Sequence, residues 1–258
     1  MCFSHLILLY HHIVPAGQVL NRSDPLDYHT PEQLERQLQE LRRRGFRFVR
    51  LPDLVASIAR RGWEPWKEIA LTFDDGYVDN YVHALPVLSK CGVPATFFVT
   101  TRHIHRGLVD PLRMSVAQLK DLLGCGMTVG SHSRTHPNLL QVPEAQAREE
   151  ITGSKADLEQ ALGTRIDLFA YPYGAHHRAQ VDLVRAAGYS AAFSAGRGAQ
   201  NTRLGMFWLF RGGLSPGMDT AEDRRALNPL GGTLRGFYRD LRKRLGYPIL
   251  AAMNRSKR

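Results

Sequence analysis

The sequence has few cysteines and no long apolar run, and both shortages narrow the classes of protein it can encode. Cys2, Cys91 and Cys125 are odd in number and form no C-x-x-C pair, which argues against a disulfide framework and against a cysteine zinc site. The apolar run Leu6–Leu9 has no Lys or Arg before it and no small-residue cleavage site after it. Because the run is also too short for a signal peptide or a membrane span, we expect a cytoplasmic protein with reduced thiols.

Net charge is scarce over most of the chain and concentrated at its end. From Arg224 onward there are ten Lys and Arg residues and one acid, Asp240, so this tail holds nearly all of the net charge of +10. A nearly neutral body makes a nucleic-acid groove unexpected, and we predict no nucleic-acid partner. Apolar residues at helical spacing predict an amphipathic helix in the tail: Leu234, Phe237, Tyr238, Leu241 and Leu245. This helix could lie on an anionic membrane or pack on the body with its basic face in water, and the sequence leaves both open.

The order of apolar segments predicts an α/β barrel. Short apolar runs alternate with longer amphipathic stretches, as in parallel strands joined by helices. The expected strands are Leu6–His11, Phe46–Arg50, Ile69–Phe73, Ala95–Thr100, Met127–Ser131, Leu168–Tyr171, Ala191–Ser194 and a short eighth at Phe207–Arg211. The first expected helix begins after the N-cap Thr30 and ends at Gly45. The others span Pro52–Arg61, Val78–Cys91, Val116–Leu123, Pro143–Leu162 and Arg178–Ala187. We predict a barrel domain over residues 1–218 and a basic extension over 219–258.

Two adjacent carboxylates, Asp74 and Asp75, follow the predicted strand that ends at Phe73. In a barrel, the polar residues just after the strands meet at one face. Adjacent residues that leave a strand point in different directions, so one carboxylate can bind a metal while the other takes a proton from water. The alternative is a solvated Asp-Asp-Gly turn.

Two histidines, His132 and His136, follow the predicted strand that ends at Ser131. Residues four apart on a helical turn can reach one ion, although so short a motif also describes ordinary surface or core histidines. With one aspartate, the histidines make a three-ligand site that keeps positions open for water and substrate.

A third polar turn, Tyr171-Pro172-Tyr173-Gly174, follows the predicted strand that begins at Leu168. Proline has no N–H and glycine permits unusual dihedral angles, so the turn can direct a backbone N–H into a site as an oxyanion donor. Equally, it can be an aromatic turn that walls the barrel.

Three segments, in this order and spacing, resemble the first three motifs of the NodB-homology polysaccharide deacetylases, carbohydrate esterase family four. They are Thr72–Gly76, Ser131–Pro137 and Tyr171–Gly174. The resemblance extends from Leu6 to Arg211 and implies a distorted (β/α) barrel of seven or eight strands. It leaves the basic tail outside.

The resemblance also implies roles for the polar residues. By the family's pattern Asp75, His132 and His136 bind a divalent metal, usually zinc and sometimes cobalt, nickel or iron. Asp74 is then the general base, and the Tyr173 N–H helps to hold the oxyanion. Tyr171 and Pro172 are then expected to contact the substrate.

The sequence departs from this family at three places. At the position of Ala170, many members carry an arginine that contacts the base aspartate. The fourth motif's Asp and Trp have no counterpart, and the late histidine that supplies the general acid is absent from Phe207–Pro216.

The start of the chain resembles a subgroup that includes poly-N-acetylglucosamine deacetylases. The matching residues are Leu8–Ile13 and Thr30-Pro31-Glu32. In this subgroup the strand that bears the acid histidine comes first in the chain, which makes His11 the candidate acid and places His12 at the substrate. The alternative is that both histidines only cap a strand.

We therefore expect a metal-dependent hydrolase that removes N-acetyl groups from an amino-sugar glycan or a lipid-linked precursor. A basic tail on an anionic membrane would place it at the inner face of that membrane. Ala170 and the missing motifs also allow a non-catalytic glycan-binding barrel, and the fold alone allows a metal-dependent amidase on a small amide.

Overall fold

The computed structural model describes residues 6–18, 28–62, 68–105, 107, 110–195, 201, 205–218 and 223. Its strands are β1 (Leu6–Tyr10), β2 (His12–Ile13), β3 (Tyr28–His29), β4 (Arg47–Phe48), β5 (Glu68–Phe73), β6 (Ala95–Val99), β7 (Thr128–Ser131), β8 (Leu168–Ala170), β9 (Ala191–Ala195) and β10 (Leu209–Arg211). Its helices are α1 (Pro31–Arg43), α2 (Leu51–Arg61), a π-helix η1 (Asn80–Ala84), α3 (Leu85–Cys91), α4 (Arg102–His105), α5 (Val116–Gly124), α6 (Glu144–Leu162), a 3-10 turn η2 (Pro172–Gly174) and α7 (Arg178–Ala186).

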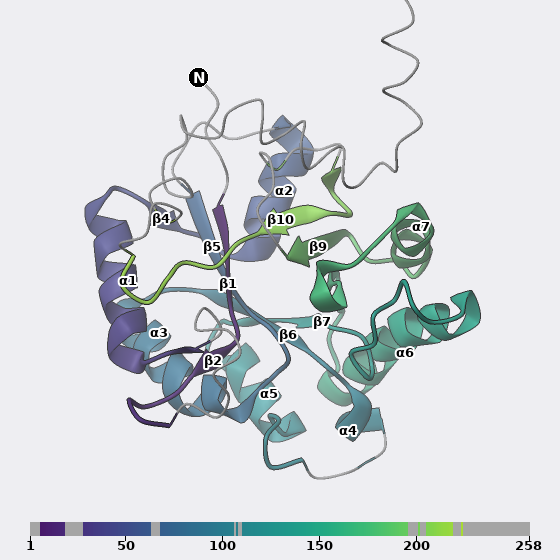
Figure 1. Cartoon of the computed structure of the whole chain (residues 1–258), viewed down its shortest axis with the longest axis horizontal. Coiled ribbons are helices and arrows are strands. Elements are labelled where there is room, and N and C mark those ends of the chain that lie inside the picture. The colour runs from purple at the N-terminus through teal and green to yellow at the C-terminus, as the bar shows by residue number, and fades with distance from the viewer. Residues whose placement is uncertain are drawn as a thin grey trace, which may run out of the picture.

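The main sheet is parallel throughout and closes into a distorted barrel. Its order is β1-β5-β6-β7-β8-β9-β10, with β4 also pairing with β5. Beyond the end of β10, Gly212 bridges Leu8 of β1, and its N–H donates to the Ile7 carbonyl at 3.0 Å. Figure 1 shows the strands at the centre with α1, α3, α5, α6 and α7 around them. The predicted fold class is confirmed, and the first strand lies between the last strand and β5.

Two apolar cores stabilise this arrangement. Most of the helices pack on the outer faces of the strands. The second core fills the barrel interior, where α2 contributes Leu51, Leu54 and Ile58 against Ile7 and Ala70. Four strand residues of this core lie at or next to the first residue of their strands: Ile7, Leu168, Ala191 and Leu209. Packed with them, α2 covers the amino-terminal end of the barrel and leaves the carboxyl end for a site.

Several predicted boundaries need correction. The strand expected at Phe46–Arg50 is only the two-residue β4, and the single helix expected at Val78–Cys91 is divided into η1 and α3. Pro86 lies in the first turn of α3 and has no N–H for a continuous α-helical ladder, so the preceding turn widens to π geometry. The predicted N-cap of α1 is confirmed, because Thr30 and Gln33 form a reciprocal capping box.

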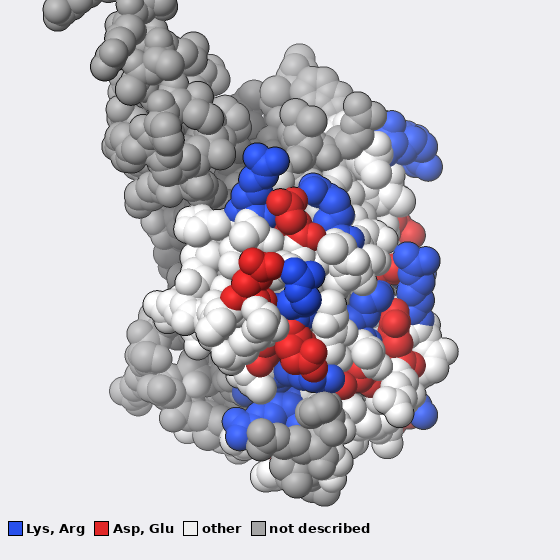
Figure 2. Space-filling model, turned by 90° about the vertical axis from the view of Figure 1, so that its right-hand side faces the viewer, with Lys and Arg blue, Asp and Glu red and all other residues white. Residues whose placement is uncertain are grey.

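The face of the molecule that bears α6 and α7 mixes positive and negative side chains without a large patch of either sign among the described residues (Figure 2). No described helix is both long enough and apolar enough to cross a membrane. The predicted extension, 219–258, lies outside the described residues apart from Asp223. Its amphipathic helix and membrane contact therefore stay predictions.

Candidate active site

The carboxyl ends of the barrel strands bring the predicted polar residues to one cavity of about 330 Å³. The pairing of β1 with β5 sets Tyr10 opposite Phe73, the last residue of each strand. The residues that follow them, His11 and Asp74, therefore lie side by side. The Asp74 N–H donates to the Tyr10 carbonyl at 3.0 Å. The cavity is lined by His11, His12, Tyr28, Asp74, Asp75, Tyr77, His132, His136, Tyr171, Tyr173, Gly174 and Ala195.

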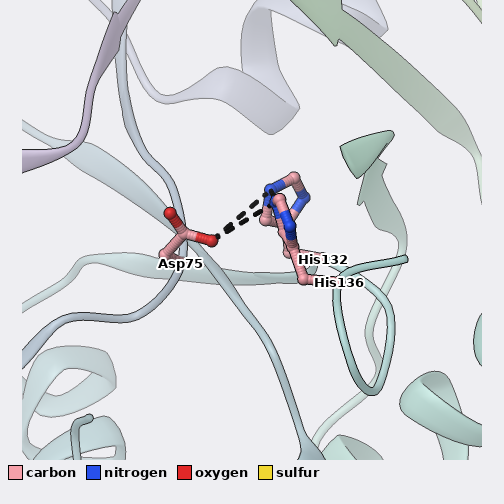
Figure 3. A group of neighbouring side chains, drawn as sticks. All are labelled: Asp75, His132 and His136. Atoms are coloured by element: carbon pink, nitrogen blue, oxygen red, sulfur yellow. Dashed lines mark hydrogen bonds and ion pairs between the residues drawn. The ribbon is translucent and has the colours of Figure 1, made fainter. Parts of the chain in front are cut away.

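Asp75, His132 and His136 direct one donor atom each toward a common point (Figure 3). The Asp75 Oδ1 atom lies 3.5 Å from His136 Nε2 and 3.9 Å from His132 Nε2. The two Nε2 atoms are 3.1 Å apart. Tetrahedral ligands at zinc–nitrogen distances of about 2.0–2.1 Å lie about 3.3–3.5 Å from one another, so this donor set fits a zinc-sized ion.

The surroundings prepare both imidazoles for this role. His132 Nδ1 lies 2.9 Å from the Ala170 carbonyl oxygen; donation of that N–H to the carbonyl orients the ring and leaves Nε2 free to bind an ion. Burial and then the neighbouring His132 lower the pKa of His136 to about 4. His136 is therefore neutral at pH 7, as a metal ligand must be.

Backbone strain is concentrated around the cavity. Asp75, Ser133, His136 and Tyr173 all have φ between 59° and 70°. This left-handed region is unfavourable for residues with a Cβ and is found preferentially where function requires an unusual conformation. The loops that carry the donor atoms are therefore held by contacts around them.

The second carboxylate, Asp74, lies outside the three-donor group and is paired with Arg211. Arg211 Nη1 and Nη2 each lie 2.6 Å from one oxygen of Asp74. Both side chains are buried, with residue exposures of 3% for Asp74 and 1% for Arg211. The guanidinium also donates to Thr72 Oγ1 at 3.2 Å and lies over the Phe98 ring.

This pair keeps Asp74 ionised. Burial alone raises the pKa of Asp74, but the charge of Arg211, with smaller contributions from His132 and His11, lowers it to about 2. Asp74 Oδ2 is 3.7 Å from His132 Nε2. A carboxylate that is ionised at pH 7 therefore stands beside the donor set without belonging to it.

Arg211 is the residue that the sequence analysis missed. It ended a predicted strand but received no role, while the arginine of the family pattern was sought at Ala170. Ala170 instead contributes its carbonyl to His132. The rule that polar residues at strand ends are functional would have identified Arg211, because it is the last residue of β10.

The turn at Tyr171–Gly174 forms part of the cavity wall, as one of the two alternatives expects, and the oxyanion donor at Tyr173 stays a prediction. Tyr171 is buried in the cavity wall, and its hydroxyl donates to the Phe207 carbonyl at 3.0 Å. The Gly174 and Ala175 amides donate within the turn, to Tyr171 and Pro172. A Cβ at Gly174 would lie 2.4 Å from the Ala195 nitrogen, so only glycine allows this close approach to β9.

The three predicted substrate-binding residues lie in different surroundings. His12 lies between the rings of Tyr28 and Tyr77, and its Nδ1 is 2.6 Å from Asp79 Oδ2. His12 and Tyr171 line the cavity, whereas Pro172 is buried and is not among the residues that line it. Their contact with substrate stays a prediction.

The fold is a distorted parallel barrel, and the carboxyl end of its strands carries a three-donor group that could hold a metal ion. A sequence model of the family described as Polysaccharide deacetylase matches residues 51–192, and the chain belongs to this family. The expected membership is thereby confirmed.

Relatives and solved structures agree with this assignment. The chain is 30% identical over 152 residues to YxkH of Bacillus subtilis, a protein named provisionally as a polysaccharide deacetylase, covering 59% of this chain and 53% of YxkH. It is 26% identical over 172 residues to a Staphylococcus aureus poly-beta-1,6-N-acetyl-D-glucosamine N-deacetylase, covering 63% and 59%. The chain thus spans little more than half the length of these relatives.

Two solved structures match over nearly the whole chain. IcaB from Ammonifex degensii has a TM-score of 0.70 at 26% identity, with 87% of this chain and 97% of that chain covered. The Streptococcus pyogenes deacetylase PplD has a TM-score of 0.76 at 24% identity, with 92% and 99% covered. At that identity, the likeness to PplD shows the fold.

Proposed function

We propose that this protein is a metal-dependent N-deacetylase that hydrolyses the acetamide of an N-acetylated amino-sugar glycan. The observation that carries the proposal is the ionised Asp74 beside the three-donor group of Asp75, His132 and His136. Binding an ion would not require this second carboxylate, whereas activating water would. Family membership and the substrate named for the staphylococcal relative support the amino-sugar class.

Asp75, His132 and His136 would hold the metal, and we propose zinc. Two imidazoles and one carboxylate form a donor set that suits zinc, with cobalt, nickel or iron as alternatives. When bound, a divalent ion supplies a Lewis acid that polarises the acetamide carbonyl and lowers the pKa of water.

The groups around the three donor atoms would divide the remaining steps. Asp74 takes the proton of the attacking water, and its alignment by Arg211 directs an oxygen toward the cavity. The Tyr173 N–H donates to the tetrahedral oxyanion. His11 protonates the nitrogen as the carbon–nitrogen bond breaks, because an amine cannot leave as an anion. Acetate and a free amino sugar result.

Removal of a metal donor should abolish both metal binding and acetate release. We expect Asp75→Ala and His132→Ala to lose most of the bound metal, measured by elemental analysis, and acetate release from N-acetylated glycans to stop when a chelator is added. Asp182→Ala, on the surface of α7, is the matched control. If both variants retain the metal content of the unmodified protein, the ligands lie elsewhere. Release of ammonia or of another acid instead of acetate would indicate an amidase of another class.

His11 should be required for turnover but not for metal binding. We expect His11→Asn to lower kcat by about 10²- to 10⁴-fold, the range of general acid catalysis, at unchanged metal content. His177→Asn, at the exposed start of α7, controls for the loss of an imidazole. Unchanged kcat in His11→Asn would show that this histidine only ends the strand.

The main argument for a non-catalytic glycan-binding barrel is weaker in view of Arg211 and His11. It rested on Ala170, where the family pattern has an arginine, and on the missing late motifs. Arg211 supplies a buried guanidinium to the base from another strand, and β1 brings His11 to the same cavity.

A further inference from the structure

One buried face of α6 is polar and lies against the loop that carries the two histidines. Glu150, Ser154 and Asp157 are spaced four and seven residues apart, which places them on one side of the helix. Glu150 and Ser154 are 6% and 0% exposed, and the Asp157 side chain is 9% exposed. Burial of a carboxylate costs free energy unless the group is fully hydrogen-bonded. The hydrogen-bond partners of Glu150 and Asp157 therefore indicate what this face of α6 binds.

Glu150 binds the backbone of the histidine loop. Its Oε2 atom accepts the N–H groups of Arg134 and Thr135, both at 2.8 Å, and its Oε1 atom accepts the Thr135 hydroxyl at 2.5 Å. These two residues lie between His132 and His136. A single carboxylate therefore binds the chain midway between the two histidines.

Asp157 holds the same loop through the Arg134 side chain. The guanidinium donates to both Asp157 oxygens, at 2.8 and 2.9 Å, and Thr101 donates to the same carboxylate at 2.7 Å. The guanidinium lies directly against Gly153, where a Cβ would approach Arg134 Cζ to 2.3 Å. A glycine between Glu150 and Asp157 is therefore what leaves room for the arginine.

The loop needs such support because its own backbone is strained. Ser133 and His136 have φ of 65° and 60°, and the Nε2 atoms of His132 and His136 are held 3.1 Å apart. An external clamp would keep the donors together before the ion arrives.

We propose that Glu150 is a positioning residue for the metal centre, assisted by the Arg134–Asp157 pair, and that it presets the His132–His136 spacing. This inference rests on the proposed function, since it presumes that the two histidines bind a metal. Glu150 is outside the set of residues that line the cavity. Its effect must therefore pass through the loop.

The test compares zinc affinity with the stability of the metal-free protein. We expect Glu150→Ala to weaken zinc binding by about 10-fold or more, the range seen when groups that orient metal ligands are removed, as measured by competition with a chromophoric chelator. Glu150→Gln keeps an oxygen for the two amides and an NH₂ for the Thr135 hydroxyl, so it should restore affinity to within a few-fold. Glu144→Ala is the matched control, because this carboxylate on α6 pairs with Arg148 in solvent.

A second variant keeps the test decisive if Glu150→Ala does not fold. Gly153→Ala keeps Glu150 but displaces the Arg134 guanidinium from Asp157, so zinc affinity should fall; the melting temperature of the metal-free protein, measured in parallel, shows whether the variant is still folded. Zinc affinity equal to that of the unmodified protein in the folded variants overturns the positioning role. Failure of the unmodified protein to bind any of zinc, cobalt, nickel and iron overturns the proposed function instead.

Discussion

Asp74→Asn is expected to retain the metal and to lose acetate release by about 10²- to 10⁴-fold, the range for removal of a general base. The donor group consists of Asp75, His132 and His136, so the amide leaves it intact. Asparagine has nearly the same shape as aspartate but cannot accept the proton of water. Metal content by elemental analysis and kcat on an N-acetylated glycan measure the two effects separately.

The control for this variant is Asp121→Asn, an exposed carboxylate that accepts a hydrogen bond from Tyr81. It makes the same chemical change far from the cavity and should keep full activity. Acetate release at the unmodified rate in Asp74→Asn would remove Asp74 from the mechanism. Loss of metal in that variant would make Asp74 a ligand.

Arg211→Met should have the largest effect on stability. The substitution leaves the buried Asp74 carboxylate without its partner, and breaking a buried pair in this way costs about 3–5 kcal/mol. Urea unfolding at pH 7 measures this loss. The free energy of unfolding of Arg211→Lys should lie between those of the unmodified protein and Arg211→Met, because lysine keeps the charge without the planar guanidinium that binds both oxygens. Arg185→Met, which removes an exposed partner of Asp182, should change stability little.

The same substitution should move the pH dependence in a defined direction. In the unmodified protein the pKa of Asp74 is lowered from 3.8 to about 2. Its stabilising contribution is therefore present above about pH 4 and is lost as pH falls toward 2. Without Arg211, burial raises this pKa, so the acid limb of kcat/KM should move to higher pH. An unchanged limb and unchanged stability would show that the pair does not control Asp74.

The local parts of the site could be predicted because their signal lies within a few residues. Asp74-Asp75 after an apolar strand, and two histidines four apart after another, are patterns that strand geometry makes meaningful. His11 could be placed because it also ends a strand. In each case a short segment specifies both the strand and the polar residue at its end.

The groups that tune the site were not predictable in this way. Arg211 is 137 residues from Asp74 in the chain, and only closure of the barrel through β10 and β1 brings it to the base. Glu150 lies within a helix that reads as an ordinary surface element. A carboxylate gives no sign in the sequence of whether its partner is solvent or a backbone amide of a distant loop.

The sequence by itself determined the barrel class, the family, and which residues could donate to a metal, because hydrophobic period and short motifs are local properties. The tertiary structure decided that the arginine expected at Ala170 comes from Arg211, that His11 stands beside Asp74, and that α6 supports the histidine loop. The physical reason is that pairing energies depend on burial and on distances of about 3 Å. Such distances between remote residues exist only once the chain has closed on itself.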